Sequence, residues 1–215
     1  MRFVYRLTGR AQFLSHLDLM LLFARSARRA GLPIAYSEGF NPHPKLSLGP
    51  AHIVGIASLA EWGDMDLTKS ISPGVFMQAL DDALPAGLEV YGAYEMPPGT
   101  PALQASLSGA DYVVETSGVR NNILETAVAN LLAQESITYM KQSPKGCKEL
   151  QLRPGIYRLE VENNRLEMEL AVGDKCNVRP QYVLAALALP ELVTCSILRT
   201  AVYIRQPDGT KKAPC

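Results

Sequence analysis

The stretch Ser15–Pro33, SHLDLMLLFARSARRAGLP, determines much of the fold that the sequence predicts. Ser15 and Asp18 match the S-x-x-[DE] capping box, in which two side chains bind the free backbone N–H groups at a helix start. Apolar residues then recur at helical spacing, until Gly31 and a proline end the pattern. The sequence therefore predicts a helix over residues 16–30.

The segments around this helix complete a first structural unit. In residues 2–8 the side chains alternate, with Phe3, Tyr5 and Leu7 on the side that faces a core and the others on the solvent side (Arg2, Val4, Arg6 and Thr8), which is typical of a half-buried strand. An acidic loop containing Trp62, Asp64 and Asp66 is expected later in the unit. The other expected elements are a buried strand (52–58), a helix with Ser72 as N-cap (72–84) and a strand (88–96). We interpret this order as β-α-β-β-α-β.

The second half of the chain repeats the order of elements but not the residues. The predicted elements are a strand (111–116), a helix (121–134), a hairpin with an Asn163-Asn164 turn (157–172), a helix (179–189) and a strand (196–205). The sequence therefore predicts an α+β fold of two ferredoxin-like β-α-β-β-α-β units in tandem, each with an antiparallel sheet. The expected boundaries are a first domain (1–95), an uncharged linker rich in Pro, Gly and Ser (96–110), a second domain (111–205) and a tail (206–215).

The composition is that of an ordinary globular protein. Of the 215 residues, 47% are hydrophobic and 20% are charged, and no apolar run approaches the roughly 18 residues that would span a bilayer. The first ten residues read as a strand rather than a signal peptide, so we expect a cytoplasmic protein without membrane contact. None of the four cysteines forms a CxxC pair, so we expect no metal and no cofactor.

The net charge of zero hides an uneven distribution of charge along the chain. Residues 1–45 hold seven Lys and Arg against two acidic residues, whereas residues 46–110 hold one Lys against seven acidic residues. A basic surface in the first segment is therefore expected, but not a protein that is basic overall.

The segment YSEGFNPHPKLS, residues 36–47, has an unusual composition, and we call it the proline loop. Two prolines flank a histidine and fix their own φ angles, and they also push the preceding residues into extended conformations. A stiff loop loses little entropy on binding, so this pattern fits a preformed binding site, although a rigid surface corner would show it too. The candidate binding residues of this loop are Gly39, Phe40, Asn41, His43 and Lys45.

The predicted helix adds further candidate residues. Asp18, Arg25 and Arg29 lie near one face, because steps of seven and four residues return to nearly the same angle around a helix. Arg28 extends the basic group, and His16 lies in the first turn. Arginines in this arrangement suit phosphate binding. The alternatives are that Asp18 only caps the helix and that the arginines form a solvated helix end.

Evidence for catalysis rests on His43 alone, because no motif supplies it with a nucleophile, a phosphate-binding loop or a metal. Recognition of bases by aromatic residues of central strands is not expected either, since residues 52–58 contain none. Contacts with RNA are instead expected from Arg2, Arg6, the arginines of the helix and the proline loop, and would address the RNA backbone.

The pattern SHLD, ARRAGLP and SEGFNPHPK, followed later by LQLRPGI and NVRPQYVLAAL, resembles the bacterial radical SAM-linked proteins, a domain family of unknown function. The resemblance covers nearly the whole chain. It implies a radical SAM protein with a cobalamin-type domain as a partner, and it carries no established activity.

Three hypotheses for the function follow from the residues and this resemblance. The first is a non-catalytic module that binds RNA (tRNA or rRNA) or presents a substrate to a radical SAM enzyme. The second is a scaffold on which that enzyme docks, with the proline loop as the contact. The third is a metal-independent RNA-processing enzyme that uses His43. We expect no activity of the protein on its own under the first two hypotheses.

Overall fold

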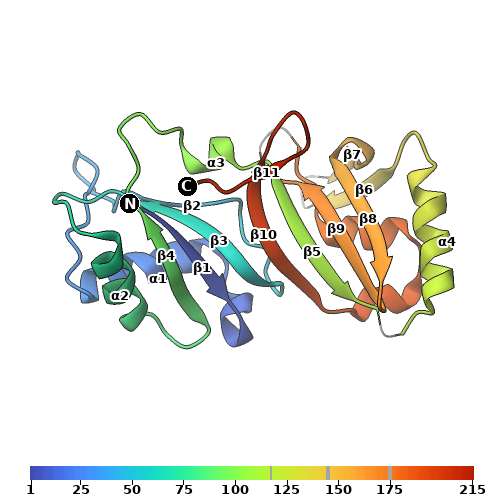
Figure 1. Ribbon diagram of the computed structural model, residues 1–215, viewed down its shortest axis with the longest axis horizontal. Helices are drawn as coiled ribbons and strands as arrows, with labels where there is room; N and C mark the ends of the chain where they lie inside the picture. The colour runs from blue at the N-terminus through green and yellow to red at the C-terminus, as the bar shows by residue number, and fades with distance from the viewer. Residues whose placement is uncertain (117, 144–145, 174–175) are drawn as a thin grey trace. The chain divides into compact units, whose positions relative to one another are not determined.

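The structure is a computed structural model that describes residues 1–116, 118–143, 146–173 and 176–215. It confirms the predicted α+β class, with strands that pair mostly in antiparallel fashion (Figure 1). Contacts divide the chain into two compact units. Unit 1 is Met1–Leu107 together with Ala201–Cys215, and unit 2 is Ser108–Thr200.

Unit 1 contains a small antiparallel sheet and two main helices. Along the sheet, β4 lies beside β1, β1 beside β3, and β2 pairs with β3. A short strand, β11 (Lys211–Lys212), pairs with the end of β10. The elements in chain order are β1 (Arg2–Leu7), η1 (Gly9–Phe13), α1 (His16–Arg29), β2 (Leu46–Leu48), β3 (Ala57–Met65), α2 (Pro73–Asp82), β4 (Leu88–Tyr94) and α3 (Leu103–Ser106).

The predicted helix 16–30 is confirmed as α1, including its capping box. The Asp18 backbone N–H donates to Ser15 Oγ at 3.2 Å, and the Ser15 backbone N–H donates to the Asp18 carboxylate at 3.2 Å. The helix ends as predicted at Gly31, whose φ of 69° lies in the left-handed region that glycine adopts without strain. The helix 72–84 is confirmed as α2, with Ser72 as its N-cap.

The core of unit 1 lies between the sheet and helices α1 and α2 (Figure 1). Phe3 of β1 is fully buried, and its ring centre lies 5.3 Å from that of Phe23 on α1 and 5.9 Å from that of Phe76 on α2. Burying an aromatic side chain of this kind contributes about 1.5–3 kcal/mol. These rings therefore fix α1, and the loop that follows it, against the sheet.

The expectation that β1 is half-buried was wrong for most of the strand, because both faces are covered from Arg2 to Tyr5. Arg2 and Val4, which were assigned to the solvent side, are 2% and 4% exposed. On that side Trp62 packs across from Val4 in the β1–β3 ladder, and its indole N–H donates to the Val202 carbonyl at 3.1 Å. Segments distant in sequence therefore cover this face.

The predicted strand 52–58 was also wrong in its position. Residues 52–56 are irregular, and the strand β3 begins at Ala57 and runs through most of the expected acidic loop. Trp62 and Asp64 thus belong to a central strand, where they pair with Val4 and Arg2 of β1. A strand-to-strand pairing over about 60 residues leaves no local pattern in the sequence.

Unit 2 also contains an antiparallel sheet, in which β5 pairs with β9 and β9 with β8. The predicted hairpin is confirmed, since Asn163 and Asn164 adopt φ angles of 49° and 60°, as a type I′ turn requires. A second hairpin formed by β6 and β7 was not predicted. The elements are β5 (Gly109–Glu115), α4 (Asn121–Leu132), β6 (Thr138–Ser143), β7 (Gly146–Gln151), η2 (Arg153–Gly155), β8 (Ile156–Glu162), β9 (Arg165–Ala171), α5 (Pro180–Ala186), η3 (Pro190–Thr194) and β10 (Ile197–Arg205).

The predicted linker and tail both contain regular structure. Residues 96–110 include helix α3, whose Leu103 is buried, and the start of β5. The segment 206–215 includes β11. The boundaries drawn from the sequence and the tandem ferredoxin-like arrangement stay predictions.

Candidate functional site

The proline loop leaves unit 1 as a narrow, hairpin-like projection after α1. Its two sides run antiparallel, since the Lys45 N–H donates to the Ala35 carbonyl and the Ser37 N–H to the His43 carbonyl, both at 2.8 Å. Tyr36 and Pro44 form an isolated β-bridge between these hydrogen bonds. The loop is therefore held at its base by backbone contacts, and residues 38–42 form its tip.

The loop is stiff for reasons that the sequence indicates. The two prolines fix their φ angles, and the His43 backbone N–H donates to Ser37 Oγ at 2.9 Å across the loop. Gly39 at the tip adopts a φ of 113°, which side chains with a Cβ rarely allow. These features restrict the conformations of the tip, so that less conformational entropy would be lost on binding.

Phe40 is the most unusual residue of this tip. Its relative exposure is 105%, so the ring is as exposed to water as in an extended peptide. Its neighbours Gly39, Asn41 and Pro42 are exposed as well. Burying a Phe side chain contributes about 1.5–3 kcal/mol, so a partner that covered this ring would gain a stabilisation of that size.

The other loop candidates lie on the two sides below the tip. The side chains of His43 and Lys45 are exposed. Arg28, in the last turn of α1, reaches the base of the loop, where its guanidinium donates to the Tyr36 hydroxyl at 3.4 Å. The structure thus brings one of the three predicted arginines together with the proline loop.

The remaining helix candidates lie elsewhere. Asp18, Arg25 and Arg29 line an open depression of about 370 Å³ on α1, which we call the α1 groove. The Arg29 guanidinium donates to Ser26 Oγ at 3.2 Å and to the Ala83 carbonyl. Lys45 instead lines a separate depression of about 460 Å³, with Asp66, Lys69 and Glu95 among its neighbours. The predicted set therefore does not line one concave surface.

Asp18 and His16 both lie in the first turn of α1, where Asp18 forms the capping box with Ser15. Hydrogen bonds from Ser15, first from its side chain and then from its backbone, lower the pKa of Asp18 below its ordinary value of 3.8. The carboxylate therefore stays charged and caps the helix. His16 is the first residue of α1 and is partly buried.

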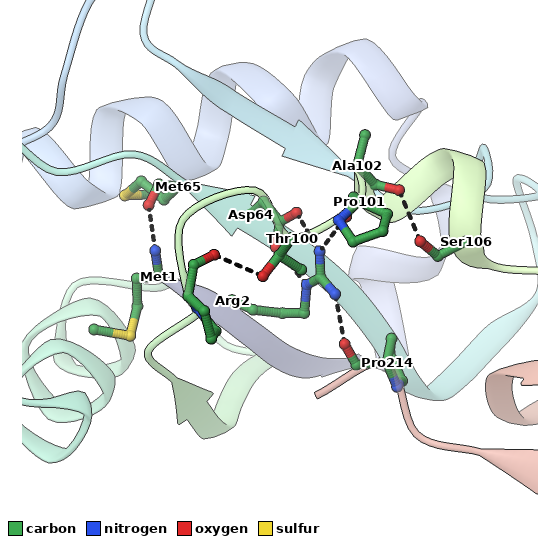
Figure 2. A network of polar contacts seen from close by, with 10 residues as sticks. Met1, Arg2, Asp64, Met65, Thr100, Pro101, Ala102, Ser106 and Pro214 are labelled. Carbon is green, nitrogen blue, oxygen red and sulfur yellow. Dashed lines mark hydrogen bonds and ion pairs between the residues drawn. The ribbon is translucent and has the colours of Figure 1, made fainter.

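Two of the basic residues expected to contact RNA are engaged within unit 1. The Arg2 guanidinium forms a two-pronged ion pair with Asp64, with Nε–Oδ1 and Nη2–Oδ2 distances of 2.7 and 2.8 Å (Figure 2). It also donates to the carbonyls of Pro101 and Pro214. Figure 2 shows these three groups, which come from separate segments, around the guanidinium of Arg2. The expectation that Arg2 contacts RNA was wrong, because its side chain is buried.

Arg6 is the second of these residues. It pairs with Glu89 at 3.0 Å, and its guanidinium carbon lies 5.1 Å from the ring centre of Tyr91. The basic surface expected from residues 1–45 is therefore smaller than their charge indicates.

The described residues also bear on metal binding and on membrane spanning. Among them, no group of three or more His, Cys, Asp or Glu side chains is placed to hold a metal ion. No helix in the described ranges is both long and apolar enough to cross a membrane.

The fold and this site define a small α+β protein whose candidate site is a stiff, exposed loop. The chain belongs to the family described as "Uncharacterized protein conserved in bacteria (DUF2344)", whose sequence profile matches residues 1–180. The match includes α1 and the proline loop. No curated protein matches the chain. The family description names no partner, so the link to radical SAM enzymes stays an expectation.

Proposed function

We propose that the protein is a non-catalytic module that binds RNA, or presents an RNA substrate, for a radical SAM enzyme in the cytoplasm. The observation that carries this proposal is the exposed Phe40 ring on the stiff tip of the proline loop. Bases of single-stranded RNA stack on aromatic rings of this kind, and each such stack is worth about 1–3 kcal/mol.

Cationic groups near the tip would hold the RNA backbone. Lys45 is exposed on one side of the loop, and Arg28 is exposed at its base. Two phosphate contacts with a single strand give a slope of about −1.4 in a plot of log affinity against log salt. The proposal therefore predicts modest salt dependence, unlike that of a strongly basic RNA-binding protein.

The test is binding of fluorescent single-stranded RNA, followed by anisotropy over a range of salt concentrations. We expect Phe40→Ala to weaken binding about tenfold, since this corresponds to about 1.4 kcal/mol of stacking, whereas Phe40→Trp keeps the affinity. Val75→Ala is the matched control, because Val75 on α2 is also an exposed apolar residue. Equal affinities for Phe40→Ala and Val75→Ala would remove the loop from RNA binding.

A specific observation favours a second function, docking of the radical SAM enzyme on the proline loop. The tip combines a single large apolar side chain with Glu38, and a buried aromatic anchor is common at the centre of protein interfaces. Replacement of residues 38–42 by Gly and Ser should then abolish co-purification of the two proteins. Co-purification that survives this replacement would argue against docking here.

The RNA-processing activity that uses His43 has less geometric support. The hydroxyl of Ser37 accepts a hydrogen bond from the backbone N–H of His43 at 2.9 Å, and this contact does not involve the imidazole that catalysis would use. Cleavage of RNA that is abolished by His43→Ala would nevertheless establish it.

The pairing order of the strands supports a finer description of the fold, in which both units are ferredoxin-like. In unit 1 the order β4-β1-β3-β2 is that of a β-α-β-β-α-β sheet, and in unit 2 the strands β5, β9 and β8 follow the same scheme. The β6–β7 hairpin would then be an insertion.

A further inference from the structure

The outer face of α1 leaves large apolar side chains in water. Leu17 and Leu21, one helical turn apart, are 73% and 55% exposed, whereas Leu19 and Phe23 on the inner face are fully buried. Phe13, just before the helix, is 64% exposed. Single exposed apolar residues are normal on protein surfaces, but a group of them on one helix face is typical of an interaction surface.

The α1 groove lies on the same outer face. Its apolar walls come from Leu14, Leu21, Leu22 and Pro85. Asp18 lies toward the N-terminal end and Arg25 toward the C-terminal end. These two residues are about 10.5 Å apart along the axis and within roughly 20° of each other around it, because seven residues make nearly two turns.

We propose that this face binds a second copy of the same chain, with the two α1 helices antiparallel across a twofold axis beside Leu21. In that arrangement Asp18 of each copy faces Arg25 of the other, so a single juxtaposition forms two ion pairs. Leu21 of each copy lies between the two ion pairs and Leu17 lies just outside them, and both leucines become buried. The antiparallel direction also brings opposite ends of the two helix dipoles together.

The distribution of charge supports a second copy as the occupant. A face with an acid at one end and a base at the other, two turns apart, is complementary to itself in the antiparallel direction, whereas a parallel pair would place like charges side by side. The neighbouring arginines have polar contacts of their own, since Arg28 donates to Tyr36 at the base of the proline loop and Arg29 donates to Ser26 and Ala83. Within the described part of the chain Arg25 is exposed and has no polar partner, so it is available for the pair.

The size of this surface sets the expected strength. One helix packed against one helix falls at the low end of specific interfaces, below roughly 1,200 Å² in total, and exposed ion pairs add little to stability. The proposal therefore implies a reversible equilibrium between monomer and dimer that shifts with protein concentration, rather than a permanent dimer.

The test is sedimentation equilibrium of the full chain from low micromolar to several hundred micromolar protein. The average mass should rise from 23.4 kDa toward twice that value as the concentration increases. Leu21→Glu and Arg25→Asp should each raise the dimer dissociation constant at least about tenfold, which is about 1.4 kcal/mol. Val75→Glu is the matched control for Leu21→Glu, since Val75 lies on α2 and is 60% exposed.

A mixing experiment identifies the pairing itself. Arg25→Asp alone and Asp18→Arg alone both place like charges opposite each other, whereas a mixture of the two variants restores both ion pairs and should form a mixed dimer. Circular dichroism checks that α1 persists in Asp18→Arg, which loses half of its capping box; if it does not, the result rests on Leu21→Glu and Arg25→Asp. A monomer at every concentration, or a dimer that Leu21→Glu and Val75→Glu affect equally, overturns the proposal.

Discussion

Removal of the Asp64 carboxylate should destabilise unit 1 more than removal of any exposed ion pair. The Arg2 side chain is 3% exposed, and its guanidinium is bound through two nitrogens to Asp64. In Asp64→Ala the arginine charge would stay buried without its counter-charge. Burial without a partner is the costly state, because a charged group that leaves water needs both a counter-charge and hydrogen bonds.

The size of the change in the free energy of unfolding follows from how exposed Arg2 and Asp64 are. Breaking a fully buried ion pair costs about 3–5 kcal/mol, and breaking an exposed pair costs about 0–1 kcal/mol. Asp64 is 25% exposed, and the carbonyls of Pro101 and Pro214 would still accept hydrogen bonds from Arg2. We therefore expect Asp64→Ala to lower the free energy of unfolding by about 2–3 kcal/mol.

The assay is a double-mutant cycle measured by urea unfolding. It compares the wild type with Arg2→Ala, Asp64→Ala and the double variant, and the expected coupling energy is about 2 kcal/mol. The matched control is the Arg6–Glu89 pair, which also joins neighbouring strands but whose side chains are 43% and 48% exposed. Its coupling energy should be about 0.5 kcal/mol.

Two results would refute this reasoning. Equal coupling energies for the two pairs would mean that the burial of Arg2 does not strengthen its interaction with Asp64. A slope of unfolding free energy against urea that differs among the variants would mean that they change the surface exposed on unfolding or the two-state behaviour, so that the coupling energy would not measure the ion pair. Arg2→Met/Asp64→Leu is informative as well, since apolar replacement of both partners should be more stable than either single alanine variant.

Three further predictions concern other parts of the chain. Gly63→Ala should destabilise unit 1 by about 2 kcal/mol in urea unfolding, because the new Cβ would overlap the buried ring of Phe3. The pKa of Asp18 is lowered, so the contribution of its carboxylate to stability is present above pH 3.8 and is lost as the pH falls below that value. The difference in urea midpoint between wild type and Ser15→Ala should therefore become smaller below pH 3.8. Burial raises the pKa of the thiols of Cys176 and Cys195. Alkylation followed by mass spectrometry should therefore modify the exposed Cys147 and Cys215 before these two.

Local patterns predicted the elements that depend on neighbouring residues. The capping box of Ser15 and Asp18 and the Asn163-Asn164 turn were found because each is a hydrogen-bonding or conformational preference within four residues. The stiffness of the proline loop was predicted for the same reason. The full exposure of the Phe40 ring was not predicted, because composition alone does not show whether a loop folds back onto the core.

Contacts distant in sequence explain what the sequence did not show. Arg2 and Asp64 both looked like surface residues, and only their pairing across β1 and β3 makes them a buried network. The predicted site failed to come together in a similar way. Arg25 and Arg28 lie three residues apart, yet one lines the α1 groove and the other contacts the loop, because the loop leaves the helix on one side only.

A hydrogen bond links the two proposed surfaces, and this has a testable consequence. Arg28 on α1 donates to Tyr36 at the base of the proline loop, so the loop is held against the helix that is proposed to dimerise. A dimer through α1 would carry two loops, and an RNA that reaches both would bind with higher affinity through the effective concentration of the second contact. We expect Leu21→Glu to weaken binding of an RNA with two single-stranded segments about tenfold or more, and to leave binding of a short single-segment RNA unchanged. Phe40→Ala should weaken both. If Leu21→Glu weakened the short RNA as much as the long one, α1 itself would contact RNA, and the division of the arginines between two surfaces would be wrong.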